Sequence, residues 1–378
     1  MNILSFYNVI EKYRDFDFPK FWDNVKDQDI KFSMNKSKLT EEDFLILLSP
    51  KSDLYIEDMA RKANGLTNQY FGKTILLYTP LYIANYCVNK CAYCGYNIEN
   101  NIIRKKLNIE EIESEAKEIS KKGFNHILLL TGESPKDTPV EYIGDAVKVL
   151  KKYFSSVSIE VFPMKEEEYR YLINLGVDGL TVYQEVYDEE IYSRVHLKGP
   201  KRNYKFRLDA PEEGCRAGIR SINIGALLGL NHWRKELFFV ALHGLYLQKK
   251  YGNTDVSFSL PRIRPHAGVF EEVYPVGDKD LVQGIIALRI MFPNCGINIS
   301  TREEESFRNN LIPLGITKMS AGVSTAVGGH TLNKESRGES QFEISDSRSE
   351  LEVKMAIRNK GYEPIFKDWI NELLSEEI

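Results

Sequence analysis

Short apolar runs recur along the chain from residue 74 onward, with amphipathic stretches between them. The runs are TILLYTPLYI (74–83), HILLLTG (126–132), VSIEVFP (157–163), DGLTVYQ (178–184), SINIGALLG (221–229), DVSFSLPRI (255–263), INISTR (297–302) and ITKMSAG (316–322). The stretches between them, such as NIEEIESEAKEISKKG (108–123), have helical spacing. Nearly continuous apolar runs that alternate with helices are typical of parallel strands covered by helices. Eight such units over about 250 residues predict an α/β fold, a (β/α)8 barrel of the TIM type. An open, doubly wound sheet is the alternative.

The chain before the first run is predicted to form a helical N-terminal extension, residues 1–72. In this part, TEEDFLILLSP begins with a capping residue, Thr40, and an acidic first turn, and YIEDMARKANGLT has helical spacing up to Gly65. We expect the barrel itself to occupy residues 73–330. Residues 331–378 follow the last predicted strand, and we expect this C-terminal segment to pack across one end of the barrel.

Composition and charge exclude several classes of protein. The 378 residues are 43% hydrophobic and 28% charged, which is enough to bury a large core. The net charge of −4, with both signs interspersed, predicts no nucleic-acid partner. The N-terminus lacks the basic start of a signal peptide, and the longest apolar run, LFFVALHGLYL (237–247), is too short to span a bilayer. We therefore expect a cytoplasmic protein with no membrane partner.

Three of the five cysteines lie together in YCVNKCAYCGY (86–96), directly after the first predicted strand. Cys87, Cys91 and Cys94 have the spacing C-x3-C-x2-C. An iron–sulfur cluster normally takes a full set of protein ligands. Three thiolates on a four-iron cluster leave one iron open to a small molecule, as the fourth position of a catalytic zinc site is open. The spacing therefore favours a reactive [4Fe–4S] cluster over a cluster for electron storage.

Two other interpretations of these cysteines are weaker. Structural zinc takes four ligands, usually from C-x2-C pairs completed by Cys or His, but the nearest histidine is His126, and Cys215 and Cys295 are isolated. Buried structural cysteines seldom occur three at a time in a loop beside polar residues such as Asn89 and Lys90. The clustering also argues against a secreted disulfide framework.

Two carboxylates lie in or at the end of apolar predicted strands, where the active sites of barrel enzymes are built. Glu160 lies in the third run, and Glu185 follows the fourth. Because a carboxylate is costly to bury without a partner, we expect each to bind ribose hydroxyls or a cation. The alternative is a structural pair with an arginine such as Arg207 or Arg220.

Positive charge gathers at the last predicted strands. Arg262 and Arg264 follow the sixth run, Arg302 ends the seventh, and Ser320 lies near the end of the eighth. A planar guanidinium can hold a carboxylate through two hydrogen bonds. An amino acid is therefore a reasonable substrate class.

The cysteine motif, with Tyr93 before its last cysteine, resembles that of the radical S-adenosylmethionine (SAM) enzymes. The resemblance implies a [4Fe–4S] cluster whose open iron binds SAM, and a 5′-deoxyadenosyl radical formed on one-electron reduction. It also implies that TGES (131–134) receives the amino group of SAM. The residues expected to bind the cofactors are Cys87, Cys91 and Cys94 as metal ligands, and Tyr93, Gly132, Glu133, Ser134, Glu160, Gln184 and Arg207 around SAM.

Further stretches are similar to one branch of that family, the tyrosine lyases of bacterial thiamine biosynthesis. They include LLTGES, VYQEVY, HLKGPKRNYKFRLDAPE, STREEESFR and QFEISDSRS, and the resemblance extends from about residue 45 to the C-terminus. It implies cleavage of the Cα–Cβ bond of L-tyrosine to 2-iminoacetate (dehydroglycine) and p-cresol, while SAM becomes 5′-deoxyadenosine and methionine. Arg302 and Ser320 are then expected to hold the substrate carboxylate. Glu160, Glu185 and His196 are the candidates for the base that takes the phenol proton.

The same resemblance implies two protein partners and leaves alternatives open. The partners are a thiazole synthase, which would receive the labile imine, and an electron donor of the flavodoxin or ferredoxin type. A tryptophan lyase is one alternative. A tyrosine lyase of the hydrogenase-maturase kind is another, but it needs further cysteines for a second cluster, and no cysteine follows Cys295. An iron–sulfur carrier is the non-enzyme alternative, and it would need neither Glu133 nor the late arginines.

Overall fold

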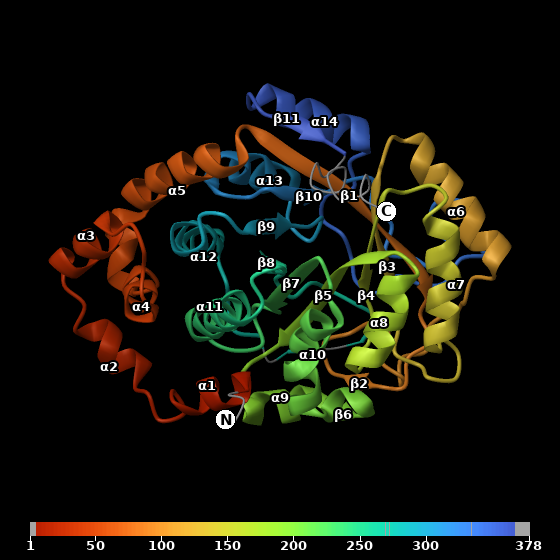
Figure 1. The fold of residues 1–378 in the computed structure, drawn as a ribbon, viewed down its shortest axis with the longest axis horizontal. Helices are drawn as coiled ribbons and strands as arrows, with labels where there is room; N and C mark the ends of the chain where they lie inside the picture. The colour runs from red at the N-terminus through yellow and green to blue at the C-terminus, as the bar shows by residue number, and fades with distance from the viewer. Residues whose placement is uncertain (1–4, 269, 272, 334, 367–378) are drawn as a thin grey trace.

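A closed barrel of parallel strands forms the centre of the molecule (Figure 1). The computed structural model describes residues 5–268, 270–271, 273–333 and 335–366. The strands of the ring are β1 (Thr74–Ala84), β3 (His126–Thr131), β4 (Ser156–Glu160), β5 (Val177–Glu185), β7 (Ser221–Ala226), β8 (Asp255–Ser259), β9 (Gly296–Ile299) and β10 (Lys318–Ser320). Pairing of β10 with β1 closes the ring, with Leu77 opposite Met319. The predicted (β/α)8 barrel is confirmed, and the open sheet is excluded.

Amphipathic helices cover the outside of the barrel. They are α6 (Ile109–Lys121), α7 (Val140–Leu150), α8 (Glu166–Asn174), α10 (Tyr204–Ala217), α11 (Trp233–Lys250), α12 (Asp278–Met291) and α13 (Glu305–Leu311). The start of α6 shows how the sequence sets a helix boundary, because Asn108 accepts the N–H of Glu111 while Glu111 accepts that of Asn108. The apolar stripe of α6, which includes Ile112, Ala116 and Ile119, is fully buried.

The N-terminal extension is helical, as expected. Its helices are α1 (Phe6–Glu11), α2 (Phe18–Asp23), α3 (Asp27–Asn35), α4 (Glu41–Leu47) and α5 (Ile56–Phe71), and α2 to α5 form an arc outside α11 and α12 (Figure 1). Thr40 caps α4 by accepting the N–H of Asp43 at 3.2 Å. The expected end of a helix at Gly65 is wrong, since α5 continues to Phe71 and ends at Gly72, which has φ +63°. Gly65 lies on the exposed side of α5, so the buried stripe passes it without interruption.

The C-terminal segment returns to the barrel. In it, α14 (Glu350–Asn359) is followed by β11 (Glu363–Ile365), which pairs in parallel with β1 outside the ring. Before α14, the backbone N–H of Ser345 donates to the carbonyl of Thr301 at 2.8 Å, and Asp346 forms a buried ion pair with Arg308. Residues 367–378 of the predicted segment lie outside the described residues. The division of the chain at residues 72 and 330 stays a prediction.

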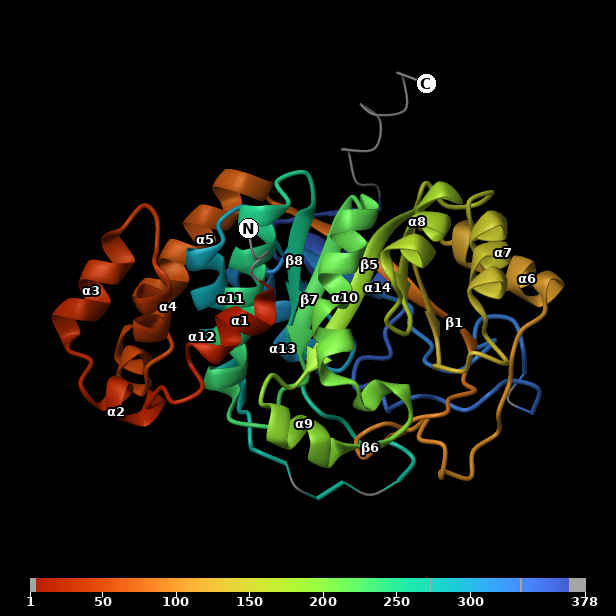
Figure 2. The same cartoon turned by 60° about the horizontal axis from the view of Figure 1, so that its bottom comes forward.

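Two short elements lie at the end of the barrel where the strands finish. They are α9 (Glu189–Val195) and β6 (His196–Lys198), and Figure 2 shows both beyond the barrel strands, beside the loop that follows β1. In this loop, β2 (Lys90–Cys91) pairs with β6 in an antiparallel arrangement that puts Cys91 opposite His196. Within the part of the chain that the structure describes, no helix is both long and apolar enough to cross a membrane.

Candidate active site

The three motif cysteines surround a single cavity at the carboxyl ends of the strands. Cys87, Cys91 and Cys94 are free thiols, and all three line this cavity, which we call the cysteine cavity. Among the described residues, no group of three or more His, Cys, Asp or Glu is arranged to hold a single metal ion. The three thiols face one space at this end of the barrel.

Two glycines allow the cysteine loop to pack closely against its neighbours. A β-carbon at Gly132 would collide with the carbonyl of Tyr86, and one at Gly95 would collide with the carbonyl of Gln341. The end of β3 and the C-terminal segment thus both lie against the loop. Burial raises the pKa of the Cys91 and Cys94 thiols, so thiolates at these positions need positive charge beside them, which iron ions supply.

The end of β3 brings Glu133 to the cysteine cavity, as predicted from TGES. Its carboxylate Oε2 accepts a hydrogen bond from Asn89 Nδ2 at 2.6 Å, and its carbonyl accepts the N–H of Val88 at 2.8 Å. Gly132 lines the cavity with it. Ser134, expected beside them, does not line either cavity of this site, because its hydroxyl turns away and donates to Asp137 Oδ2 at 2.6 Å. Ser134 thus stabilises the turn that follows β3.

The two predicted carboxylates both face this site but have different environments. Glu185, the one non-glycine residue with positive φ among the described residues (+71°), accepts hydrogen bonds from Lys201 Nζ at 2.7 Å and Arg207 Nη2 at 3.2 Å. Burial alone would raise the pKa of Glu185, but the two cations lower it. Burial raises the pKa of Glu160 to about 7, and the neighbouring charge of Glu185 adds to the effect. At neutral pH, Glu160 is therefore the carboxyl group able to exchange a proton.

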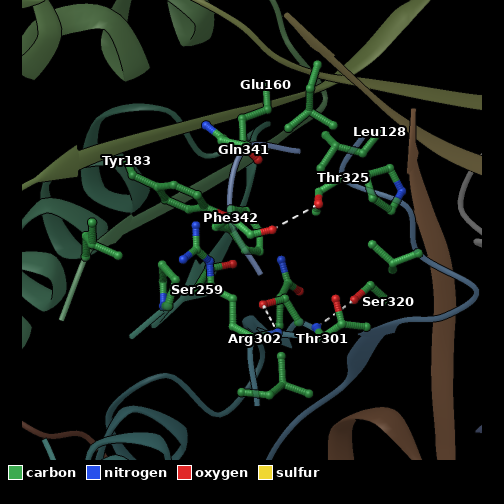
Figure 3. A pocket seen from close by; sticks show the side chains of 18 of the residues that line it. Leu128, Glu160, Tyr183, Ser259, Thr301, Arg302, Ser320, Thr325, Gln341 and Phe342 are labelled. Atoms are coloured by element: carbon green, nitrogen blue, oxygen red, sulfur yellow. Dashed lines mark hydrogen bonds between the residues drawn. The ribbon is translucent and has the colours of Figure 1, made fainter. Parts of the chain in front are cut away.

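A second cavity adjoins the first and contains the expected substrate residues; we call it the substrate cavity (Figure 3). The guanidinium of Arg302 lies 3.5 Å over the ring of Phe342, and its Nη1 donates to the carbonyl of Arg262 at 3.3 Å. Ser320 lies in the same wall, where its hydroxyl accepts the N–H of Thr301 at 3.1 Å. The two cavities adjoin, because seven residues line both of them: Tyr82, Cys94, Leu130, Glu160, Glu185, Lys201 and Gln341.

The other late arginines have partners of their own. Arg262 forms ion pairs with Glu303 and Asp278, and Arg264 donates to the carbonyl of Arg302. Neither lines the substrate cavity. Arg302 is therefore the late arginine that the structure brings to the site.

Besides Ser134, two more predicted site residues do not line either cavity. Gln184 is buried, and it lies between Tyr183 and Glu185, which both face the site; alternation along the strand turns its side chain the other way. His196 is also buried: its Nδ1 donates to the carbonyl of Tyr192 at 2.9 Å, and Nε2 accepts the Tyr93 hydroxyl at 2.7 Å. Burial, and then the charge of Lys201, lower the pKa of His196 well below its usual value. A neutral His196 thus supports Tyr93, which lines the substrate cavity, and has no direct access to a substrate phenol.

Comparison with known proteins agrees with this geometry. Residues 81–240 match the Radical SAM superfamily, and residues 259–363 match the Biotin and Thiamin Synthesis associated domain. The chain is 40% identical to the 2-iminoacetate synthase of Escherichia coli K12 over 92% of its own length and 94% of that protein, and 39% identical, with the same coverage, to the enzyme of Salmonella typhimurium LT2. It belongs to the 2-iminoacetate synthase family. The crystal structure of HydG, a maturase of the [FeFe]-hydrogenase, superposes with a TM-score of 0.88 at 29% identity over 95% of this chain and 82% of that one.

As a member of the 2-iminoacetate synthase family, the protein uses a [4Fe–4S] cluster and SAM. The residues present fit both groups. Three free thiols face one cavity. A carboxylate, Glu133, and a guanidinium, Arg207, line the same cavity, where they would meet the amino and carboxylate groups of SAM. Arg207 also pairs with Glu185, which is the structural pair that the sequence offered as the alternative, and its contact with SAM stays a prediction.

Several residues of this synthase site were not predicted from the sequence. Asn89 and Lys201 are one example: the backbone N–H of Lys201 donates to Asn89 Oδ1 at 2.9 Å, which ties the cysteine loop to the chain after β6. Gln341 and Phe342 come from the C-terminal segment. All four lie in stretches that resemble the tyrosine lyases, but only the folded chain shows which of their side chains reach the cavity.

Proposed function

We propose that this protein cleaves the Cα–Cβ bond of L-tyrosine, giving 2-iminoacetate and p-cresol, with SAM converted to 5′-deoxyadenosine and methionine. The observation that carries the proposal is the shared wall of the two cavities: a cysteine cavity with Glu133 adjoins a substrate cavity that contains Arg302 and Ser320. This arrangement supports a cofactor and an amino acid held side by side. An iron–sulfur carrier has no use for the second cavity.

The protein's part in the reaction is binding, orientation and exclusion of water, because the cofactors supply the radical chemistry. Bound together, the cluster and SAM provide a 5′-deoxyadenosyl radical after one-electron reduction. Arg302 and Ser320 would hold the tyrosine carboxylate, with Phe342 stacked on the guanidinium so that the Arg302 fork keeps one orientation. The amino group of tyrosine is then presented to the neighbouring cavity.

Of the three candidates for the phenol base, the structure favours Glu160. His196 does not reach the cavity, and Glu185 is held by Lys201 and Arg207, which makes it a weak base. Glu160 lines both cavities, and its raised pKa lies near physiological pH. Removing the phenol proton would stabilise the departing side chain, since the charge and the unpaired electron then spread onto oxygen.

The product points to the partners of the reaction. A free imine is hydrolysed in water, so 2-iminoacetate should pass to a thiazole synthase, and the cluster needs a one-electron donor of the flavodoxin or ferredoxin type. Both partners, and a cytoplasmic location, are part of the proposal.

The proposal is tested with reconstituted protein under anaerobic conditions, given SAM, a chemical reductant and L-tyrosine. We expect p-cresol and 5′-deoxyadenosine in equal amounts, with glyoxylate from hydrolysis of the imine. Formation of neither product would favour the carrier. Deoxyadenosine without p-cresol would leave a radical SAM enzyme with another substrate.

Arg302→Lys tests how the carboxylate is held. Lysine keeps the charge but loses the planar fork, so tyrosine turnover should fall steeply; loss of a buried, charged partner costs on the order of 2–5 kcal/mol. The Arg302→Lys variant should still form 5′-deoxyadenosine slowly from SAM when no tyrosine is present. Arg264→Lys, outside the cavity, is the matched control. Unchanged tyrosine dependence in Arg302→Lys would show that the carboxylate is bound elsewhere.

Glu160→Gln tests the phenol base through pH. A base acts only when deprotonated, so with a pKa of about 7 the rate of p-cresol formation should rise as the pH passes upward through 7. Glu185 raises this pKa, while Arg302, Arg207 and Lys201 lower it. In the glutamine variant this inflection of the pH profile should disappear. Its rate of p-cresol formation should be lower by a factor of about 10²–10⁴. If it instead loses affinity for SAM, Glu160 binds ribose, as the sequence also allowed.

A further inference from the structure

Two side-chain amides point their N–H groups at the cluster cysteines. Asn89 Nδ2 lies 3.7 Å from Cys87 Sγ, and Gln341 Nε2 lies 3.8 Å from Cys94 Sγ. Asn89 is part of the cysteine loop, whereas Gln341 comes from the C-terminal segment, 247 positions beyond Cys94. Both side chains line the cysteine cavity.

Each amide is held in this orientation by partners for its oxygen. Asn89 Oδ1 accepts the backbone N–H of Lys201 at 2.9 Å, and because that N–H can only donate, the amide nitrogen must face the other way, toward Cys87 and Glu133. In Gln341, Oε1 accepts the hydroxyl of Tyr82 at 3.1 Å while Nε2 faces Cys94, so each amide atom has a partner of the matching kind.

The backbone fixes Gln341 as well. Its carbonyl accepts the N–H of Gly95 at 3.2 Å and fills the space that a β-carbon at Gly95 would need. The C-terminal segment is therefore attached to the cysteine loop one residue after the last ligand. A side chain anchored this closely keeps a constant distance to the thiolate, which a flexible side chain would not.

Hydrogen bonds to cluster sulfurs change the energy of the two redox states unequally. Reduction adds a negative charge to the cluster, so an N–H dipole aimed at a ligating sulfur stabilises the reduced state more than the oxidised one. We propose that Asn89 and Gln341 are positioning residues that raise the reduction potential of the cluster by donating N–H to the sulfurs of Cys87 and Cys94. This inference rests on the proposed function only in so far as the three cysteines hold a cluster.

The test measures the potential of the reconstituted cluster, with mediators and without SAM or tyrosine, by following the EPR signal of the reduced state. In Gln341→Leu, which removes the N–H at similar volume, we expect the equilibrium constant for reduction to fall up to about tenfold, which is about 59 mV for one electron. In Tyr82→Phe the oxygen of the Gln341 amide loses its hydrogen-bond donor, so we expect the reduction potential to fall as well, but by less.

Gln248→Leu is the matched control. Gln248 Nε2 donates to the sulfur of Cys295 at 3.0 Å, a similar contact at a cysteine that is not a ligand, so its loss should leave the potential unchanged. If Gln341→Leu does not retain iron, Gln341→Glu keeps the shape and places an acceptor beside the sulfur, and the potential should fall further.

A potential in these Gln341 variants equal to that of the parent, at equal iron content, would overturn the inference. So would an equal shift in Gln248→Leu. Because no substrate is present, the result is independent of the tyrosine lyase assignment: a shift in potential with no p-cresol from the parent would retain this inference and reject the proposed function.

Discussion

Cys91→Ala is expected to abolish 5′-deoxyadenosine formation and to leave no stable iron–sulfur absorbance after reconstitution. Cys91 is 4% exposed and lies on β2, where pairing with β6 fixes its position. Two remaining thiolates leave two irons of the cluster without protein ligands. No neighbouring group replaces the lost sulfur, because the described residues bring no fourth cysteine or histidine to the cysteine cavity.

Cys215→Ala and Cys295→Ala are the controls for this result. Both thiols are buried in the barrel framework, away from the cysteine cavity, and behave as small apolar groups. Each variant should keep its iron content and its deoxyadenosine yield, measured by iron assay and chromatography. Full activity of Cys91→Ala would contradict the assignment of the ligands. So would loss of bound iron in Cys295→Ala.

The strand starts could be predicted more closely than the strand ends. The run beginning at residue 157 matches β4, which starts at Ser156, but the predicted strand continues to residue 163 whereas β4 ends at Glu160. The run at 255–263 likewise outlasts β8, which ends at Ser259. Residues beyond the carboxyl ends, such as Val161 and Leu260, remain buried in the barrel mouth. Their apolar character reflects the walls of the site, which the pattern alone does not distinguish from strand.

The sequence predicts a site residue when a chemically suitable side chain directly follows a strand. It does not predict a site residue whose role depends on the direction in which its side chain points. The cysteine motif and Glu133 directly follow strands, so the fold itself delivers them to one end of the barrel. Gln184 and His196 lie in stretches that also resemble the tyrosine lyases, but neither side chain reaches the cavities. Strand alternation turns Gln184 away, and a hydrogen bond to Tyr93 holds His196 away. Gln341 is separated from the motif by most of the barrel, and no local pattern links the two.

Tyrosine should be consumed at least about 10⁴-fold more efficiently than phenylalanine, judged by the rates of aromatic product formation. A site built to hydrogen-bond a substrate hydroxyl rejects the analogue that lacks it by roughly 10⁴–10⁵. In the substrate cavity the group proposed to receive the phenol proton, Glu160, is half-buried, so a bound phenylalanine would cover its carboxyl group without offering it a hydroxyl partner. A free phenol has a pKa of about 10, and a base with a pKa of about 7 makes its ionisation during the reaction feasible.

The chemistry of the leaving group adds to this discrimination. A side chain that departs from Cα must carry an unpaired electron, and an ionised phenol delocalises it onto oxygen, which a bare phenyl ring does not do. Phenylalanine should therefore give no toluene, and tryptophan no indole product, while tyrosine gives p-cresol in step with deoxyadenosine. Glu160→Gln should lower the ratio of the turnover rate of tyrosine to that of phenylalanine, mainly because the turnover of tyrosine becomes slower. If tryptophan is turned over faster than tyrosine, the cavity is built for an indole, and the tryptophan lyase takes the place of the tyrosine lyase proposed for this chain.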